Sequence, residues 1–255
     1  MSGAGAGCRA GELRVSLREC RLLVERALLV AGAPRGSVAS AVDLVVAAQA
    51  AGVPALSSLV EESAASGLEE GPLRLDNGPD GQVFADVAGG SALLALGAVL
   101  DVAQMLEGEG GGPVVLTNAR HVPLAAGLEV LAARRGRRLV GVGFAGGEEF
   151  VVGEAGEPAR QRLRAALPDG AGEGLGSFAA AVYPANEPPA SALARLAGDS
   201  ATAAVIENQM CVPEQTWWEL FELSNRALTP ASERSRRDTG IVPEAERSGE
   251  IVDAY

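Results

Sequence analysis

The chain of 255 residues contains no lysine, and this absence excludes several enzyme classes. Without a lysine the chain cannot form a Schiff base with pyridoxal phosphate, and it lacks the residue with which a P-loop contacts nucleotide phosphates. Its glycine pairs at 89–90, 111–112 and 146–147 do not form a GxGxxG pattern between a strand and a helix. The sequence therefore contains no standard phosphate-binding loop.

Cysteine and histidine are also scarce. Cys8, Cys20 and Cys211 are an odd number and form no CxxC pair, so we expect reduced thiols rather than a disulfide scaffold or a structural zinc site. His121 is the single histidine, and the acidic residues lack the loop spacing of a cation site. The sequence thus predicts no metal site. No serine lies in a G-x-S-x-G context that would indicate a hydrolase.

Basic clusters and long apolar runs are missing as well. A net charge of −12, with no stripe of arginines among aromatics, argues against nucleic acid as a partner. No apolar run approaches the roughly 20 residues that cross a bilayer, and the first residues lack a signal pattern. We therefore expect a cytoplasmic protein without a membrane partner. Hydrophobic residues make up 47% of the chain but aromatics only 4%, which predicts a core of alanine, valine and leucine.

Apolar spacing predicts a helical unit before any strand appears, with Ser16 and Glu19 as the capping box of its first helix. Helix and strand patterns then alternate, which indicates α/β layers. The expected elements are helices at 16–30, 38–51 and 55–66, a hairpin within 71–90, a core helix at 91–106, a strand at 113–117, a helix at 124–135, strands at 138–144 and 150–152, a helix at 157–167, a strand at 178–183, a helix at 189–197, a strand at 203–206 and a helix at 214–227.

These patterns predict one α/β domain over residues 13–228, in which a helical N-terminal unit precedes a mixed, layered sheet domain. The helical part spans 13–70 and the sheet-containing part 71–228. Residues 1–12 are small and glycine-rich, so we expect a flexible N-terminus. Residues 229–255 are polar and mixed in charge, which favours an irregular, extended or disordered C-terminal arm.

Two adjacent tryptophans, Trp217 and Trp218, lie in the last predicted helix. Neighbouring residues cannot both face one stripe of a helix, so we expect one in the core and the other partly exposed or in an interface. One interpretation of the exposed tryptophan is a contact in a homodimer.

His121 is the leading candidate for chemistry because it follows a predicted strand in the segment Asn118-Ala119-Arg120-His121. Groups at strand ends often face a cleft that holds a small-molecule ligand. An imidazole can protonate a carbonyl or deprotonate a hydroxyl near neutral pH, and Arg120 beside it can hold a substrate carboxylate. A structural or merely exposed histidine is the alternative.

Two segments carry a resemblance to a known family: FADVAGGSALLALGAVLDVA at 84–103 and VVLTNARHVPLAAGLEVLAARRGRRLVGVGF at 114–144. Together with the opening helices, so that residues 17–144 are covered, they resemble the malate/L-lactate dehydrogenase-type oxidoreductases, which have a non-Rossmann NAD(P) fold and include reductases of cyclic imino acids. The resemblance implies NAD(P) as cofactor, without indicating which residues bind it. It places the catalytic proton-transfer histidine on His121, and we take Asn118 and Arg120 beside it as the candidate substrate-binding residues.

The segments AAQAAGVPALSSLVEE at 47–62 and TWWELFELSNRALTPASERSR at 216–236 carry a second resemblance. They resemble an uncharacterised bacterial family of similar length and unknown function. This resemblance supports the fold and length but implies no reaction.

Two hypotheses about function stay open. In the first, the chain is a diverged oxidoreductase, or an isomerase-like enzyme, that acts on a small 2-oxo, 2-hydroxy or cyclic imino carboxylate with His121 as acid and base. In the second, it is a non-catalytic small-molecule-binding or accessory subunit that kept the fold. The dehydrogenase family carries Gly-Val-Asp-Ser-His-Gly after its second helix, whereas this chain has GVPALS at 52–57 and no histidine there. That difference favours the second hypothesis.

Overall fold

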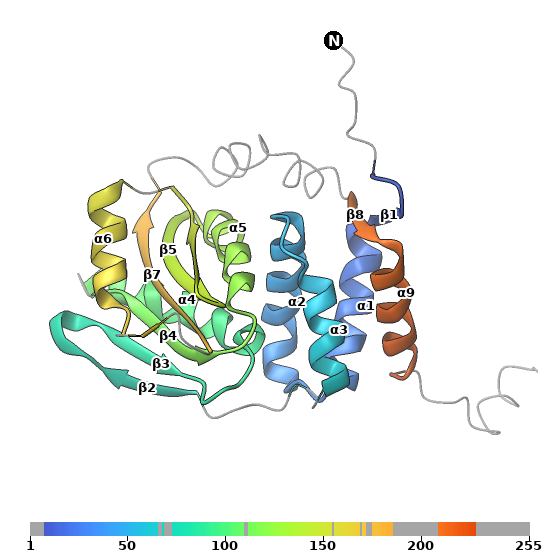
Figure 1. The fold of residues 1–255 in the computed structure, drawn as a ribbon, viewed down its shortest axis with the longest axis horizontal. Coiled ribbons are helices and arrows are strands. Elements are labelled where there is room, and N and C mark those ends of the chain that lie inside the picture. Colours follow the sequence, from blue (N-terminus) through green and yellow to red (C-terminus); the bar gives the residue numbers. More distant parts are fainter. Residues whose placement is uncertain are drawn as a thin grey trace, which may run out of the picture.

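The chain forms a helical lobe and a sheet lobe that lie side by side (Figure 1). Helix α2 (Arg35–Ala50) lies between them and contacts helices of both lobes. The mixed α/β architecture agrees with the prediction. The computed structural model describes residues 8–65, 68, 73–109, 112–154, 156–168, 170–171, 175–185 and 209–227.

The sheet lobe is built on six strands in the order β2-β3-β4-β7-β5-β6. Strands β3 and β4 are parallel, because helix α4 carries the chain back between them, and all other neighbours are antiparallel. The predicted hairpin is formed by β2 and β3, joined through the 3-10 turn η1 (Pro79–Gly81). The strands are β2 (Arg74–Asn77), β3 (Val83–Asp86), β4 (Val114–Ala119), β5 (Arg137–Ala145), β6 (Glu148–Val152) and β7 (Gly176–Pro184).

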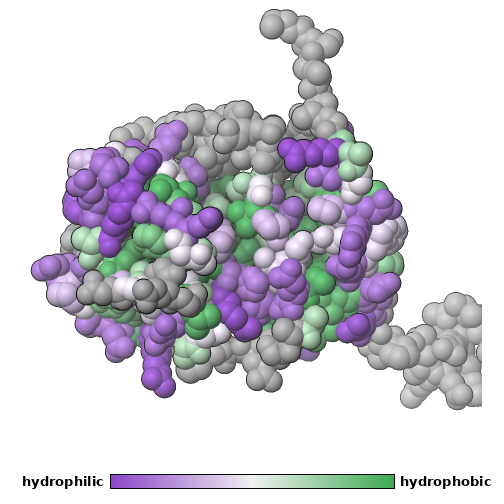
Figure 2. Space-filling model, viewed as in Figure 1, coloured by the Kyte–Doolittle hydropathy of each residue, from purple (hydrophilic) through white to green (hydrophobic). Residues whose placement is uncertain are grey.

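Helices cover both faces of this sheet. Helices α4 (Ala92–Glu109) and α5 (Gly127–Arg134), the latter preceded by the 3-10 turn η2 (Val122–Ala126), lie on one face, and α6 (Glu157–Ala166) packs on the other. Side chains of a strand alternate between faces, so in β4 Leu116 joins the core under α4 whereas Val115 packs under α6. Over α6, Figure 2 shows a strongly hydrophilic outer surface.

The helical lobe contains α1 (Leu17–Val30), α2, α3 (Ala55–Ala65) and α9 (Glu214–Asn225). Helix α1 begins at the predicted capping box: Glu19 N donates to Ser16 Oγ over 3.1 Å, and Ser16 N donates to Glu19 Oε2 over 3.1 Å. Helix α2 is buried on most sides, and its own buried residues are alanine, valine and leucine, as the composition predicts. A Cβ on Gly127 would lie 2.8 Å from the Leu44 carbonyl oxygen, so a glycine is needed where α5 approaches α2.

Two strands were missed. Strand β1 (Glu12–Ser16) precedes α1 and pairs antiparallel with β8 (Gln209–Pro213), so the prediction of a helical unit before any strand is wrong. Only Val15 of β1 is buried, and its partner strand lies almost 200 residues away, so local periodicity gives no signal. The elements predicted at 189–197 and 203–206 lie outside the described residues, as does the arm at 229–255.

The end of the described chain returns to the helical lobe. Helix α9 packs against α1 and α3 and lies beside them in Figure 1, although the sequence grouped it with the sheet-containing part. Its two tryptophans divide as predicted: Trp217 packs against the core, whereas Trp218 is 50% exposed. Within the described part of the chain, no helix combines the length and the apolar character needed to cross a membrane.

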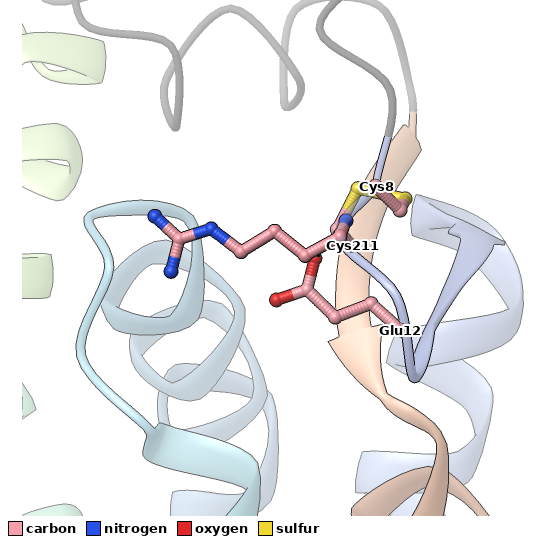
Figure 3. Close-up of a disulfide and its surroundings, with 4 residues drawn as sticks. Cys8, Glu12 and Cys211 are labelled. Atoms are coloured by element: carbon pink, nitrogen blue, oxygen red, sulfur yellow. Dashed lines mark hydrogen bonds between the residues drawn. A yellow bond between two sulfur atoms is a disulfide. The ribbon is translucent and has the colours of Figure 1, made fainter.

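Cys8 and Cys211 form a disulfide, so the prediction that all three thiols are reduced is wrong for this pair (Figure 3). Cys8 precedes β1 and Cys211 lies in its partner strand β8, and the Cα atoms of the two cysteines are 5.5 Å apart, a proximity that spacing along the chain cannot reveal. Cys20 is free and fully buried in the core. Burial raises the pKa of the Cys20 thiol to about 12, so this thiol is protonated and unreactive in the folded protein.

Counting thiols with a chromogenic disulfide reagent tests this arrangement. The folded, unreduced protein should give no fast-reacting thiol, because one cysteine is buried and two are bonded to each other. In denaturant without reductant the count should be one per chain, and after reduction three. Three thiols in denaturant without reductant would show that the disulfide does not form.

Candidate functional site

The carboxyl end of β4 has an irregular backbone. Its pairing with β7 shifts register between Leu116 and Ala119, and Asn118 within the shift has φ 53°. His121, two residues after the strand, also has a left-handed conformation, with φ 56°. Asparagine and histidine tolerate this conformation better than most residues, but it still costs free energy. Bulges of this kind redirect side chains at strand ends.

Hydrogen bonds to the loop before α4 hold this strand end in place. Arg120 N donates to the Gly90 carbonyl oxygen over 3.0 Å, and Ala92 N donates to the Arg120 carbonyl oxygen over 2.9 Å. The backbone of Arg120 is thus fixed on both sides. The loop and the strand end form one rigid unit that determines where the side chains of residues 120 and 121 lie.

Asp86, at the end of β3, adds a second anchor. Its Oδ1 accepts hydrogen bonds from Ala88 N at 2.8 Å and from Asn118 Nδ2 at 3.0 Å. These bonds, first that from Ala88 and then that from Asn118, hold the pKa of Asp86 below its usual value. The stabilisation is therefore present above the ordinary aspartate pKa and is lost as the pH falls through the lower pKa of the folded state.

A buried carboxylate faces this strand end. The side chain of Glu62, on α3, is only 2% exposed; its Oε1 lies 3.0 Å from His121 Nε2 and its Oε2 lies 3.3 Å from Arg120 Nη2. Both contacts are within ion-pair distance, although neither has the geometry of a directed hydrogen bond. Burial of an unpaired carboxylate is strongly unfavourable. The side chains of Arg120 and His121 beside Glu62 reduce that cost.

The contact with Glu62 gives the imidazole a defined orientation. Nε2 faces the carboxylate, and no described residue forms a hydrogen bond with Nδ1, while the side chain as a whole is 25% exposed. The Arg120 side chain is 37% exposed, although its Nε is buried without a hydrogen-bond partner. The arrangement is a carboxylate–imidazole pair beside a guanidinium, which is suited to proton transfer on an anionic ligand.

The structure thus brings two of the predicted site residues together, His121 and Arg120. The side chain of the third, Asn118, is bonded to Asp86 instead. Glu62 was missed by the sequence analysis, although a signal exists. Leu56 and Leu59 mark the buried face of α3, and Glu62 follows at the next helical position, where an apolar residue is expected.

Two cavities among the described residues lie elsewhere. One of about 500 Å³ is at the opposite end of the sheet, where it is lined by Pro113, Tyr183 and residues of α6. The other, of about 400 Å³, lies between α1 and α2. Neither of these two cavities is lined by His121.

Comparison with known proteins concerns the fold. No family model and no curated protein matches the sequence. Among solved structures, malate dehydrogenase from Pyrococcus horikoshii matches with a TM-score of 0.58 and 12% identity, over 88% of this chain and 98% of that one. A dehydrogenase from Sinorhizobium meliloti matches with a TM-score of 0.53 and 16% identity, over 84% of this chain and 99% of that one. This chain has the fold of these dehydrogenases. The resemblance to malate/L-lactate dehydrogenase-type proteins is thereby confirmed at the level of the fold.

The left-handed conformation of His121 can be tested by comparing two substitutions, His121→Ala and His121→Gly. Both remove the imidazole from Glu62, so their difference reports the backbone alone. Because an L-residue is disfavoured at φ 56°, the glycine variant should be more stable by about 1 kcal/mol in urea unfolding.

Glu61, an exposed residue within α3, provides the matched control. There Glu61→Gly should be less stable than Glu61→Ala by about 1 kcal/mol, because glycine is unfavourable inside a helix. If the glycine variant were the less stable one at position 121 also, the left-handed conformation would be refuted.

Proposed function

We propose that the residues at the end of β4 form an acid–base site for a small 2-oxo, 2-hydroxy or cyclic imino carboxylate, in a diverged relative of the malate/L-lactate dehydrogenase-type oxidoreductases. The proposal rests on one observation: the 3.0 Å contact between buried Glu62 and partly exposed His121. A carboxylate that orients an imidazole and balances its positive charge is a common device for proton transfer.

Each residue has a distinct role in this proposal. His121 gives a proton to the carbonyl oxygen or imine nitrogen of the ligand, or removes one from its hydroxyl. Glu62 is a positioning residue that holds the ring and stabilises the imidazolium. Arg120 binds the ligand carboxylate through N–H groups that do not face Glu62, because a guanidinium has five donors. Asn118, whose side chain is bonded to Asp86, is a candidate contact for the ligand.

The cofactor implied by the fold, NAD(P), fits the described residues around His121 poorly. A diphosphate needs free backbone N–H groups or cations, typically at a helix N-terminus. At the start of α4, Ala92 N already donates to the Arg120 carbonyl oxygen, and Leu93 N donates to Ser91 Oγ over 3.3 Å. The guanidinium of Arg120, beside His121, is paired with Glu62. Use of NAD(P) by this chain therefore stays a prediction.

Kinetics and binding test the proposal. The protein is titrated with NADH and NADPH by fluorescence and with a panel of 2-oxo, 2-hydroxy and cyclic imino acids by calorimetry, and turnover is followed with those that bind. His121→Ala should lower kcat by about 10²- to 10⁴-fold, the usual contribution of a general acid or base, with a smaller change in KM. Glu62→Gln should lower kcat less, because the imidazole is still present.

Glu61→Gln is the matched control for Glu62→Gln, since it changes the adjacent, exposed carboxylate on the same helix. It should behave as wild type. The acid–base proposal fails if no carboxylate of the panel binds, or if His121→Ala turns over as fast as wild type.

A non-catalytic carboxylate-binding or accessory role is the second candidate. It is favoured by the occupied N–H groups at the start of α4 and by the segment at 52–57, which lacks the histidine of the dehydrogenase family. Binding of a carboxylate that requires Arg120, without turnover in the presence of either nucleotide, would distinguish this role from catalysis.

A further inference from the structure

Three side chains that can ligate a metal meet at the edge of the helical lobe. Each of Cys8, Glu12 and Cys211 offers one ligand atom, and these atoms lie within 4.8 Å of one another. Figure 3 shows the Glu12 carboxylate on the same side of the β1–β8 pair as the disulfide. All three residues are partly exposed, so a small reductant or an ion can reach them.

The pairing of β1 with β8 holds Glu12 and Cys211 near each other independently of the sulfur–sulfur bond, and a turn closed by the hydrogen bond from Glu12 N to the Arg9 carbonyl oxygen, 3.1 Å long, connects Cys8 to β1. Strands β1 and β8 pair over five residues, from Glu12 opposite Pro213 to Ser16 opposite Gln209. Just beyond them, Glu214 N donates to the Gly11 carbonyl oxygen over 2.9 Å. The two strands therefore keep their register when the disulfide opens.

The Glu12 carboxylate is also oriented in advance. Its Oε2 accepts a hydrogen bond from Arg9 N at 2.8 Å, in the short turn between Cys8 and β1. A ligating carboxylate is commonly fixed by such an outer contact, which lowers the cost of ordering it when an ion binds.

We propose that the reduced protein binds one zinc-type divalent cation through the thiolates of Cys8 and Cys211 and the carboxylate of Glu12. A dithiol reductant supplies two electrons and two protons: the sulfur–sulfur bond breaks, two thiols form, and the reductant becomes a disulfide. The cation then binds both sulfurs as thiolates and displaces their two protons into solvent.

The chemistry and the spacing both suit zinc. Two thiolates and a carboxylate are ligands that zinc accepts, with a water molecule in the fourth position. At bond lengths of about 2.0 to 2.3 Å, a tetrahedral ion holds its ligand atoms roughly 3.3 to 3.8 Å apart. All three ligand atoms lie within 4.8 Å of one another, and after reduction the two sulfur atoms can move apart to this separation by rotation of their side chains.

Such a site would replace the disulfide as a link across the chain. The disulfide joins residues 203 positions apart and ties β8, and with it the start of α9, to the N-terminal strand. Thr216 of α9 contacts Ser57 of α3 through their hydroxyls at 3.1 Å. An ion at Cys8, Glu12 and Cys211 would keep β8, and with it the start of α9, linked to the N-terminal strand after the disulfide is reduced.

Cobalt(II) is the probe for this site, because thiolate–cobalt bonds give an intense charge-transfer absorption. Full-length protein is reduced with a phosphine, freed of reductant without air, and titrated with cobalt(II). One equivalent should bind and give the thiolate band, zinc(II) should then displace it, and the thermal midpoint of the reduced protein should rise when zinc is added. The unreduced protein should give no band.

Two variants and one control make the outcome decisive. Cys211→Ser should abolish the band, and Glu12→Gln should keep a weaker band with an affinity lower by at least roughly tenfold, the smallest loss typical of a removed outer contact. Cys20→Ala, which removes the buried thiol outside the cluster, should bind like wild type. The proposal is overturned if reduced wild type gives no band, or if the band survives in Cys211→Ser.

Discussion

The buried charge of Glu62 is the constraint on which the arrangement of the two lobes depends. The carboxylate belongs to α3 in the helical lobe, whereas the two groups that balance it, Arg120 and His121, follow β4 in the sheet lobe. Removing one partner of a buried ion pair typically costs about 3 to 5 kcal/mol. These contacts link α3 to the strand end, where Asn118 and His121 have left-handed conformations.

The rest of the interior consists of closely packed, small apolar side chains. Alanine, valine and leucine fill the core, so helices approach closely, and α2 can lie between the lobes while contacting α1, α3, α4 and α5. The close packing leaves little freedom for α3 to move relative to β4. The polar cluster of Glu62, Arg120 and His121 thus lies in a closely packed surrounding, with the imidazole side chain 25% exposed.

The fold of this chain and the chemistry of its candidate site rest on different observations. Two solved dehydrogenases share its architecture over most of its length, at an identity that demonstrates the fold alone. The described residues near His121 are suited to proton transfer and to binding a carboxylate, whereas the N–H groups at the start of α4 are already occupied. The described residues therefore support a site for proton transfer more strongly than a site for a dinucleotide.

Local patterns in the sequence determined most of the secondary structure. The capping box at Ser16, the apolar spacing of the helices, the hairpin and the strand before His121 were all predicted, because each depends on residues a few positions apart. The same reasoning selected His121 and Arg120, since both follow a strand end. It did not select Glu62, because a glutamate on a helix is usually solvated, and only the tertiary structure shows that this one is buried beside Arg120 and His121.

The pairing of β1 with β8 and the disulfide between Cys8 and Cys211 were likewise decided only in three dimensions. Their partners are about 200 residues apart, and no periodicity or motif spans that distance. Apart from β1 and β8, the sequence by itself determined which of the described segments are helices and strands, and it indicated which side chains can do acid–base chemistry. The tertiary structure decided which of those side chains meet, because contacts between distant segments arise from the packing of whole elements rather than from the order of residues within them.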